Sequence, residues 1–319
     1  MATVLITGAQ RPIGANLAVT LATAFDVVAV FEDGPAPRSG RNKGKSQPNS
    51  ALRSLPGCQA VRVANAAETS DLIHGVEPQA VICCNSISHS AWSQSRIDPN
   101  RESVAICALA QAACRVEAHF TLVSSDAIFD RPQVFHAEDS PARSADAMWM
   151  QSLESAATEW GGLVLRTHPL AWGFGGESSF CEHMETSLAN RTAFAVSPAR
   201  YATPVLVDDF AEGWVRAYDA GLRGTLHLGG AERVSQLRLA RMLANEMDES
   251  AALKKLIALT APSGEPRETS LCSRAARKLL GWQPSSLADT VQEFVAQKTN
   301  GRWDALGRTA SPLLQPQAA

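Results

Sequence analysis

The chain has 319 residues, 45% of them hydrophobic and 19% charged, which allows a large buried core in one or two domains. Its net charge of −3 gives no positive field that would attract nucleic acid or an anionic membrane. No apolar run approaches the roughly 18 residues of a membrane span, and we expect no signal peptide before the first predicted strand. The seven cysteines have no metal-binding spacing, so we expect small buried thiols, no metal site and a cytoplasmic location.

The N-terminus predicts a strand, a glycine turn and a helix in immediate succession. The apolar run 4–6 is typical of a buried parallel strand, Gly8 ends it, and apolar residues from Ile13 onward follow at helical spacing. Gly14 opens that helix, whose first N–H groups and positive dipole suit a pyrophosphate. This order predicts a dinucleotide-binding domain.

Arg11 and Pro12 make this turn irregular, because a glycine is usual between its outer glycines. Two interpretations follow: Arg11 turns outward and pairs with a phosphate of the cofactor, or Arg11 and Pro12 together close the site. We favour retained binding of NAD or NADP. The candidate cofactor-binding residues are Gly8, Gln10, Arg11, Pro12, Ile13, Gly14, Glu32, Cys84 and Asn85.

A second strand is predicted over 27–31, and Glu32 follows it. An acid at this point commonly accepts hydrogen bonds from the adenosine ribose, whereas the alternative is a solvated turn. Residues 34–56 contain Gly, Pro, Ser, Arg and Lys and predict a surface loop, whose cations are within reach of a 2′-phosphate. Glu32 and these cations therefore give opposing indications for NAD and NADP.

Strands and helices alternate through the rest of the first half. Strands are predicted over 59–63, 78–85, 120–125 and 163–167, and helices over 70–75, 99–113 and 144–160. This alternation predicts an α/β fold of the Rossmann type, with a doubly wound parallel sheet covered on both faces. We expect residues 1–170 to form this dinucleotide-binding domain, with the sheet completed by segments within 200–230.

The alternation loosens after residue 170, which predicts a smaller C-terminal substrate-binding part over 171–298. Helices are expected over 180–189, 234–246 and 285–297, the segment 203–209 leads into a helix that ends at 218, and a strand is expected over 224–230. Such a part would cap the carboxyl ends of the sheet, where ligands bind in open α/β folds. Residues 299–319 predict a loose tail.

Four segments, in this order, resemble the dTDP-4-dehydrorhamnose reductase family of extended short-chain dehydrogenases/reductases. They are VSSDAIFD at 123–130, LRT at 165–167 with WG at 172–173, ATPVLVDDFA at 202–211, and SLCSR at 270–274 with LLGWQP at 279–284. The resemblance covers residues 3 to about 297. It implies NAD(P) along the glycine turn and a 4-keto nucleotide sugar as the substrate. It also implies proton transfer by a Ser/Thr, a Tyr and a Lys four residues after the Tyr.

The chain departs from that family at the proton-transfer residues. Ser125 matches the hydroxyl position, but aligning the Tyr–Lys motif onto residues 139–152 places Met148 at the Tyr and Ser152 at the Lys. No other register restores the pair, because neither of the two tyrosines, Tyr201 and Tyr218, has a lysine four residues later. A thioether cannot donate a proton.

Two further departures lie near the expected cofactor. Glu102 stands about where the family has an asparagine, and Cys83-Cys84-Asn85 replaces its NAA segment. Among possible substitute acids, His168 follows the strand 163–167, while Asp126 and His136 lie in loops near the same edge. The competing interpretation of His168 is a loop histidine satisfied by backbone groups.

The leading hypothesis is a catalytically degenerate binding or regulatory protein on a nucleotide-sugar reductase scaffold, since the Tyr–Lys pair is lost while the flanking motifs remain. A protein partner is then expected in addition to a small molecule. The alternative is an active NAD(P)H-dependent reductase of a 4-keto nucleotide sugar that uses a substitute proton donor. A third interpretation is an interaction protein without either ligand.

Overall fold

The computed structural model describes residues 1–32, 55–93, 98–130, 133–173, 179–260 and 266–307. Its centre is a seven-stranded sheet in the order β11-β6-β5-β4-β1-β2-β3, in which every neighbouring pair is parallel. The predicted Rossmann-type α/β sheet is therefore confirmed. Its strands are β1 (Thr3–Thr7), β2 (Asp26–Glu32), β3 (Cys58–Val63), β4 (Ala80–Cys83), β5 (His119–Ser125), β6 (Leu163–Thr167) and β11 (Gly224–Leu228).

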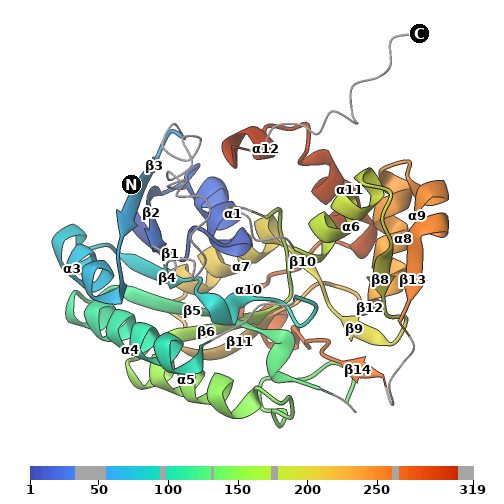
Figure 1. Ribbon diagram of the computed structural model, residues 1–319. Coiled ribbons are helices and arrows are strands. Elements are labelled where there is room, and N and C mark those ends of the chain that lie inside the picture. Colours follow the sequence, from blue (N-terminus) through green and yellow to red (C-terminus); the bar gives the residue numbers. More distant parts are fainter. Residues whose placement is uncertain (33–54, 94–97, 131–132, 174–178, 261–265, 308–319) are drawn as a thin grey trace, which may run out of the picture.

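Helices cover both faces of this sheet (Figure 1). One face is covered by α1 (Pro12–Leu21) and α7 (Val207–Asp219), and the other by α3 (Ala66–Val76), α4 (Pro99–Arg115) and α5 (Ala147–Glu159). The alternation of side chains along β1 serves both faces: Val4 and Ile6 enter one core cluster and Leu5 enters the other. An apolar run without polar interruptions is what such a doubly covered strand requires.

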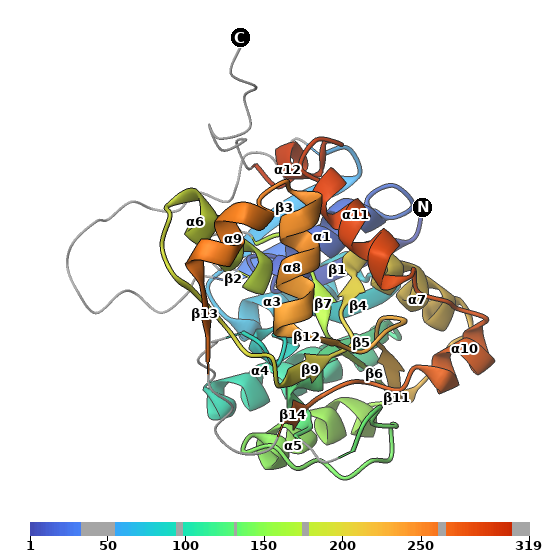
Figure 2. The ribbon, with the colours of Figure 1, turned by 90° about the vertical axis from the view of Figure 1, so that its right-hand side faces the viewer.

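The C-terminal part lies beside the sheet and is built from short elements (Figure 2). The described residues of this part form three small sheets, in which β8 pairs with β13, β7 pairs with β10, and β9 lies between β12 and β14. Helices α6, α8 and α9 pack on one another. The bounds are β7 (Pro169–Leu170), α6 (Phe180–Ala189), β8 (Phe194–Val196), β9 (Arg200–Ala202), β10 (Val205–Leu206), β12 (Val234–Ser235), α8 (Gln236–Glu246), α9 (Ser250–Leu256), β13 (Ile257–Leu259), β14 (Arg267–Glu268), α10 (Arg274–Leu280) and α11 (Leu287–Ala296).

The expected loose tail is wrong for its first residues. Residues Arg302–Ala305 form α12, whose Trp303 is buried, and the Arg302 guanidinium donates to the carbonyl oxygen of Asn16 at 3.1 Å and to Thr20 Oγ1 at 2.8 Å. An aromatic anchor and an arginine thus attach this segment to α1. Residues 308–319, and 33–54 of the predicted surface loop, lie outside the described residues.

The carboxyl ends of the central strands meet at one edge, where three short segments continue from them. The 3-10 turn η1 (Ser86–Ser88) follows β4, the turn η2 (Asp126–Ile128) follows β5, and β7 follows β6 after one residue. In parallel sheets this edge is where ligands bind. In the described ranges, no helix is long and apolar enough to cross a membrane.

Candidate functional site

Two glycines set the turn after β1. Gly8 has φ +68, and a Cβ there would stand 2.1 Å from the carbonyl oxygen of Cys84. A Cβ on Gly14 would stand 2.4 Å from the carbonyl oxygen of Gly8. Both positions therefore require glycine, because the end of β4 and the start of α1 pack directly against the turn.

Arg11 shows that the third expected glycine is not needed for backbone geometry. Its φ of −96 and ψ of 155 suit any residue, and its N–H donates to the carbonyl oxygen of Gly8 at 2.9 Å. Its Nη2 donates to Ser86 Oγ at 2.8 Å, so the side chain crosses from the β1 turn to the β4 turn. Pro12 carries no N–H, which leaves the N–H of Ile13 as the first helix donor free to face a phosphate.

Glu32 ends β2 beside this turn, and Gln10 Oε1 accepts a hydrogen bond from its backbone N–H at 3.3 Å. Burial raises the pKa of the Glu32 carboxyl, an effect that Arg101 and Arg11 oppose. Its Oε1 is buried without a hydrogen-bond partner among the described residues. An orphaned acceptor at the end of β2 matches a ribose hydroxyl, so the adenosine half of a dinucleotide fits this position.

Cys84 and Asn85 lie at the end of β4, on the other side of the turn. Asn85 Oδ1 accepts a hydrogen bond from Thr7 Oγ1 at 3.1 Å, which joins the ends of β1 and β4. Glu102 Oε1 accepts the backbone N–H of Ile87 at 3.1 Å and so holds η1 from α4. Burial raises the pKa of Glu102. The acid that departs from the family pattern thus supports the turn against which a cofactor would lie.

Asp126 and His168 form a buried hydrogen-bonded pair at the ends of β5 and β6. Asp126 Oδ2 lies 2.7 Å from His168 Nδ1 and also accepts Thr269 Oγ1 at 2.6 Å. Its Oδ1 accepts the backbone N–H of Ala91 at 2.9 Å and Ser125 Oγ at 3.3 Å. Burial alone would raise the pKa of Asp126, but His168 and these hydrogen bonds together lower it. The carboxylate is therefore ionised and fully engaged.

The His168 ring lines a cavity of about 540 Å³ between the sheet edge and the C-terminal part. Trp92 packs edge-on against the ring with centroids 4.5 Å apart. The cavity extends from the start of α1 to the β8 region, and its lining combines aromatic rings with cations. Among these residues are Arg11, Trp92, His168, Phe180, Phe194 and Arg200. A pocket of this size and composition suits a small molecule with a ring and an anionic group.

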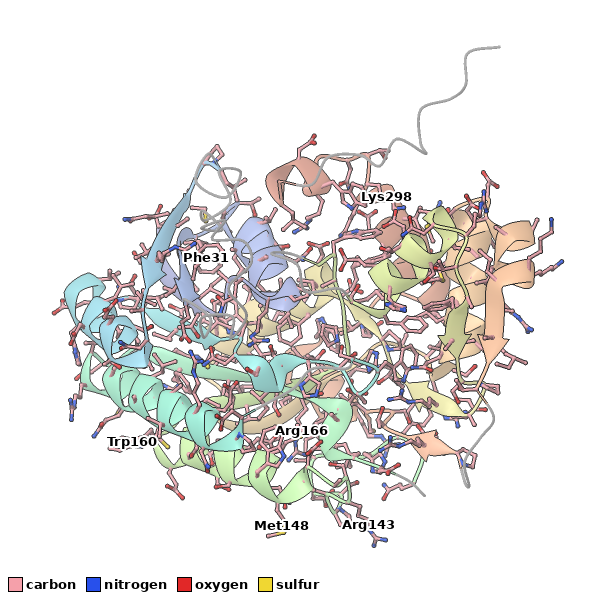
Figure 3. All side chains as sticks on the ribbon, in the orientation of Figure 1. Phe31, Arg143, Met148, Trp160, Arg166 and Lys298 are labelled. Atoms are coloured by element: carbon pink, nitrogen blue, oxygen red, sulfur yellow. The ribbon has the colours of Figure 1, made fainter. Side chains whose placement is uncertain are left out.

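Other predicted residues are not brought to this cavity. Ser125 is fully buried, and its Oγ accepts the backbone N–H of Ala127 at 2.9 Å as a cap of η2. Met148, 86% exposed, lies on the outer face of α5 (Figure 3), and Ser152 of the same helix is exposed as well. His136 packs in parallel against the Phe129 ring. The placement of Met148 and Ser152 at the site is corrected accordingly.

The inner face of α5 carries different groups. Glu154 accepts the Arg166 guanidinium of β6, with Nη2 2.6 Å from Oε2, and Ser124 Oγ at 2.5 Å. Neither face of α5 holds a Tyr or Lys, since residues 147–159 contain none. Thr269 and Trp92 were not identified from the sequence, because both are far from His168 along the chain. Thr269 could have been found from its place directly before the 270–274 motif, whereas nothing in the sequence indicated Trp92.

Comparisons with known proteins place this geometry in a family. Residues 1–300 match the profile described as RmlD substrate binding domain. The Bordetella bronchiseptica enzyme WbmH in complex with NAD+ has TM-score 0.71 at 20% identity, covering 94% of this chain and 100% of that one. The Bacillus anthracis dTDP-4-dehydrorhamnose reductase with NADP has TM-score 0.67 at 14%, covering 93% and 99%. Its dTDP-glucose 4,6-dehydratase with NAD has TM-score 0.72 at 13%, covering 95% and 98%. At these identities the likeness shows the fold alone. A comparison with curated sequences finds no match.

Proposed function

The chain belongs to the RmlD substrate binding domain family, and from this premise we propose that it binds a nucleotide sugar in the cavity beside His168. The observation that carries the proposal is the cavity lining. Phe180 and Phe194 offer flat apolar surfaces for a base, and Arg200 offers a guanidinium group for a diphosphate. Solved relatives on this scaffold include a dTDP-4-dehydrorhamnose reductase and a dTDP-glucose 4,6-dehydratase.

The same proposal includes NAD or NADP in the crevice between β1 and β4. Glu32 Oε1 would accept the ribose hydroxyl, while the N–H of Ile13 and the Arg11 guanidinium would face the pyrophosphate. Such a cofactor supplies or accepts a hydride when bound. Glu32, whose Oε1 has no partner among the described residues, supports NAD over NADP, because a 2′-phosphate beside this acid would be repelled. The seven unpaired cysteines fit a reducing cytoplasm.

The tyrosine–lysine route of the family is not available to this chain. Its α5 has neither residue, and the Ser125 hydroxyl is used within the protein. We therefore propose that the protein is degenerate with respect to that pair, and that binding of the nucleotide sugar is its basic activity. If the protein does not convert the bound ligand, we propose that ligand binding regulates a protein partner.

Isothermal titration calorimetry with dTDP, dTDP-glucose, NADH and NADPH tests this proposal. We expect dTDP-glucose to bind, and Phe180→Ala to weaken binding about tenfold through lost stacking. Val104→Ala on the exposed face of α4 is the matched control and should leave the affinity unchanged. If none of the four compounds gives a heat of binding at millimolar concentration, the proposal is contradicted.

A specific observation favours a second candidate function, an NAD(P)H-dependent reductase of a keto nucleotide sugar. The Asp126–His168 pair lies at the ends of β5 and β6, and its His168 lines the cavity in which the sugar would bind. This candidate shares the binding step with the first and differs from it only in turnover. Incubating the protein with dTDP-4-dehydrorhamnose and NADPH or NADH, and following absorbance at the nicotinamide band, separates the two.

A further inference from the structure

We propose that Nε2 of His168 is the acid–base group of the cavity, and that Asp126 and Thr269 position its ring. The proposal rests on the nucleotide-sugar binding proposed above and names the residue that the second candidate function requires. It departs from the family's tyrosine, because the residue lies after β6 rather than on α5. The geometry of three residues from three distant segments carries it.

The first step is the fixed tautomer of His168. An ionised carboxylate only accepts hydrogen bonds, so His168 Nδ1, 2.7 Å from Asp126 Oδ2, must carry a proton. Asp126 cannot turn away, because Thr269, Ala91 and Ser125 occupy its remaining acceptor positions. The Trp92 ring against the imidazole limits rotation. Nε2 is consequently an acceptor when the ring is neutral and a donor when it is protonated.

The second step is the direction of Nε2. Among the described residues Nε2 has no hydrogen-bond partner. It is not one of the fully buried polar atoms that lack a partner, and the residue lines the cavity, so Nε2 is accessible from the cavity. This distinguishes His168 from the structural histidines. His119 and His227 each place a ring nitrogen on a backbone carbonyl oxygen, at 3.0 and 3.1 Å, and neither lines the cavity.

The charged and titratable groups around the pair come from three elements. His89 follows η1, His136 lies in the loop after η2, and Arg200 belongs to β9. Each of them interacts electrostatically with Asp126. Burial lowers the pKa of His89 and of His136, so both are neutral near pH 7. Arg200 is the permanent cation of the group, and it lies in the cavity wall where an anionic ligand would neutralise it.

The proton balance of the reduction is simple. A reduced nicotinamide dinucleotide, when bound, would supply the hydride that the carbonyl carbon of the sugar accepts. His168 would give the proton on Nε2 of its imidazolium to the carbonyl oxygen, which would become an alcohol, and the ring would be left neutral with Nδ1–H still on Asp126. Solvent then returns a proton to Nε2. Positioned acids of this kind accelerate proton transfer by about 10²- to 10⁴-fold.

Steady-state kinetics with dTDP-4-dehydrorhamnose and NADPH or NADH test the role of Nε2. We expect His168→Gln to lower kcat at least about 100-fold with a smaller change in KM. His74→Gln, on the exposed face of α3, is the matched control. Because the donor must be protonated, kcat of the wild type should fall as pH rises, and this dependence should be absent in His168→Gln. An unchanged kcat in His168→Gln overturns the proposal.

Thr269→Val and Thr269→Ser test positioning with little risk to folding. Valine removes the hydroxyl that fixes Asp126, so kcat should fall about tenfold, whereas serine should restore it. Asp126→Asn is the stronger variant of the same test. If valine and serine have equal kcat and the same pH profile, Thr269 has no positioning role.

Nitrogen NMR of ¹⁵N-histidine-labelled protein gives a readout without turnover. The wild type should show His168 with Nδ1 protonated and an Nε2 resonance that moves when dTDP-glucose is added; Thr269→Val should broaden or mix the tautomers. A moving Nε2 signal with measurable turnover supports the proposal. Binding of dTDP-glucose by calorimetry without either response overturns it and leaves the binding function intact, whereas absence of binding refutes the proposed function itself.

Discussion

Glu154 and Arg166 form a two-pronged ion pair inside the protein, with Nη2 2.6 Å from Oε2 and Nε 3.0 Å from Oε1. The pair joins the inner face of α5 to β6, and Ser124 of β5 donates to the same carboxylate. Arg166 Nη1 continues to the carbonyl oxygen of Glu138 at 3.1 Å. The inner face of α5 is thereby committed to holding the helix against the sheet.

Glu154→Gln should be strongly destabilising. The substitution keeps the shape of the side chain but leaves the Arg166 guanidinium as a buried charge without its counter-ion, a change that costs about 3–5 kcal/mol. Urea unfolding measures the free energy of unfolding. Glu212→Gln, which breaks the exposed pair of Glu212 and Arg216 on α7, is the control and should cost at most about 0.5 kcal/mol. Equal effects of the two substitutions would contradict the assignment of Glu154 to the fold.

Gly8→Ala should destabilise more than Gly161→Ala, although both glycines have φ near +70. The backbone strain of a side chain in that region is common to both and costs about 1–2 kcal/mol. Only at Gly8 does the added Cβ also meet the carbonyl oxygen of Cys84 at 2.1 Å, whereas nothing lies within 4 Å at Gly161. Melting temperatures of the two variants give the comparison, and an equal loss would mean that the β1 turn moves freely away from β4.

The sequence predicted the sheet and its main helices because their signals are local. Residues 4–6 and 163–165 are continuous apolar runs, and both lie in strands of the structure. The short ladders of the C-terminal part were missed, since strands of two or three residues such as β12 carry no period. Trp303 was missed because its partners, which include the Trp172 ring, are distant along the chain.

The candidate site was predicted in its parts but not in its connections. Glu32 and His168 were identified as candidates from their positions after strands, a local property of α/β sequences. The link from His168 through Asp126 to Thr269 spans 143 residues between the carboxylate and the hydroxyl, so no spacing rule reveals it. The exposure of Met148 was not predicted, because the face of a helix that packs on the core depends on tertiary contacts that a motif alignment does not give.

The free energy of unfolding should fall as pH decreases from about 6.5 toward 3, in part because of His227. Burial and the neighbouring Arg166 lower the pKa of His227 to about 3 in the folded protein. Below the ordinary histidine pKa of about 6.5 the unfolded chain takes up a proton that the folded chain refuses, so stability falls by about 1.4 kcal/mol per pH unit from this residue. The decline from His227 ends near pH 3, where the folded protein also binds the proton.

Unfolding in urea at pH 7, 6, 5 and 4 tests this dependence. His227→Asn keeps an amide donor for the carbonyl oxygen of His136, which His227 Nδ1 contacts at 3.1 Å, but it does not titrate. Its stability should therefore decline less steeply with falling pH, by about one proton's slope. His74→Asn on the exposed face of α3 is the control and should keep the wild-type slope. An unchanged slope in His227→Asn would show that the buried ring is protonated in the folded state.

Arg11 decides whether the irregular turn receives or excludes a dinucleotide. Its extended backbone accommodates a side chain, and its guanidinium is held at Ser86 Oγ, near the start of α1 where the proposed pyrophosphate would lie. A charge-assisted hydrogen bond is worth about 1.5–3 kcal/mol, so Arg11→Met should weaken NADH binding by about 10- to 100-fold. Arg115→Met, at the exposed end of α4, should leave the affinity unchanged. Tighter binding by Arg11→Met would show that the guanidinium obstructs the crevice, and the nucleotide sugar would then bind without a dinucleotide.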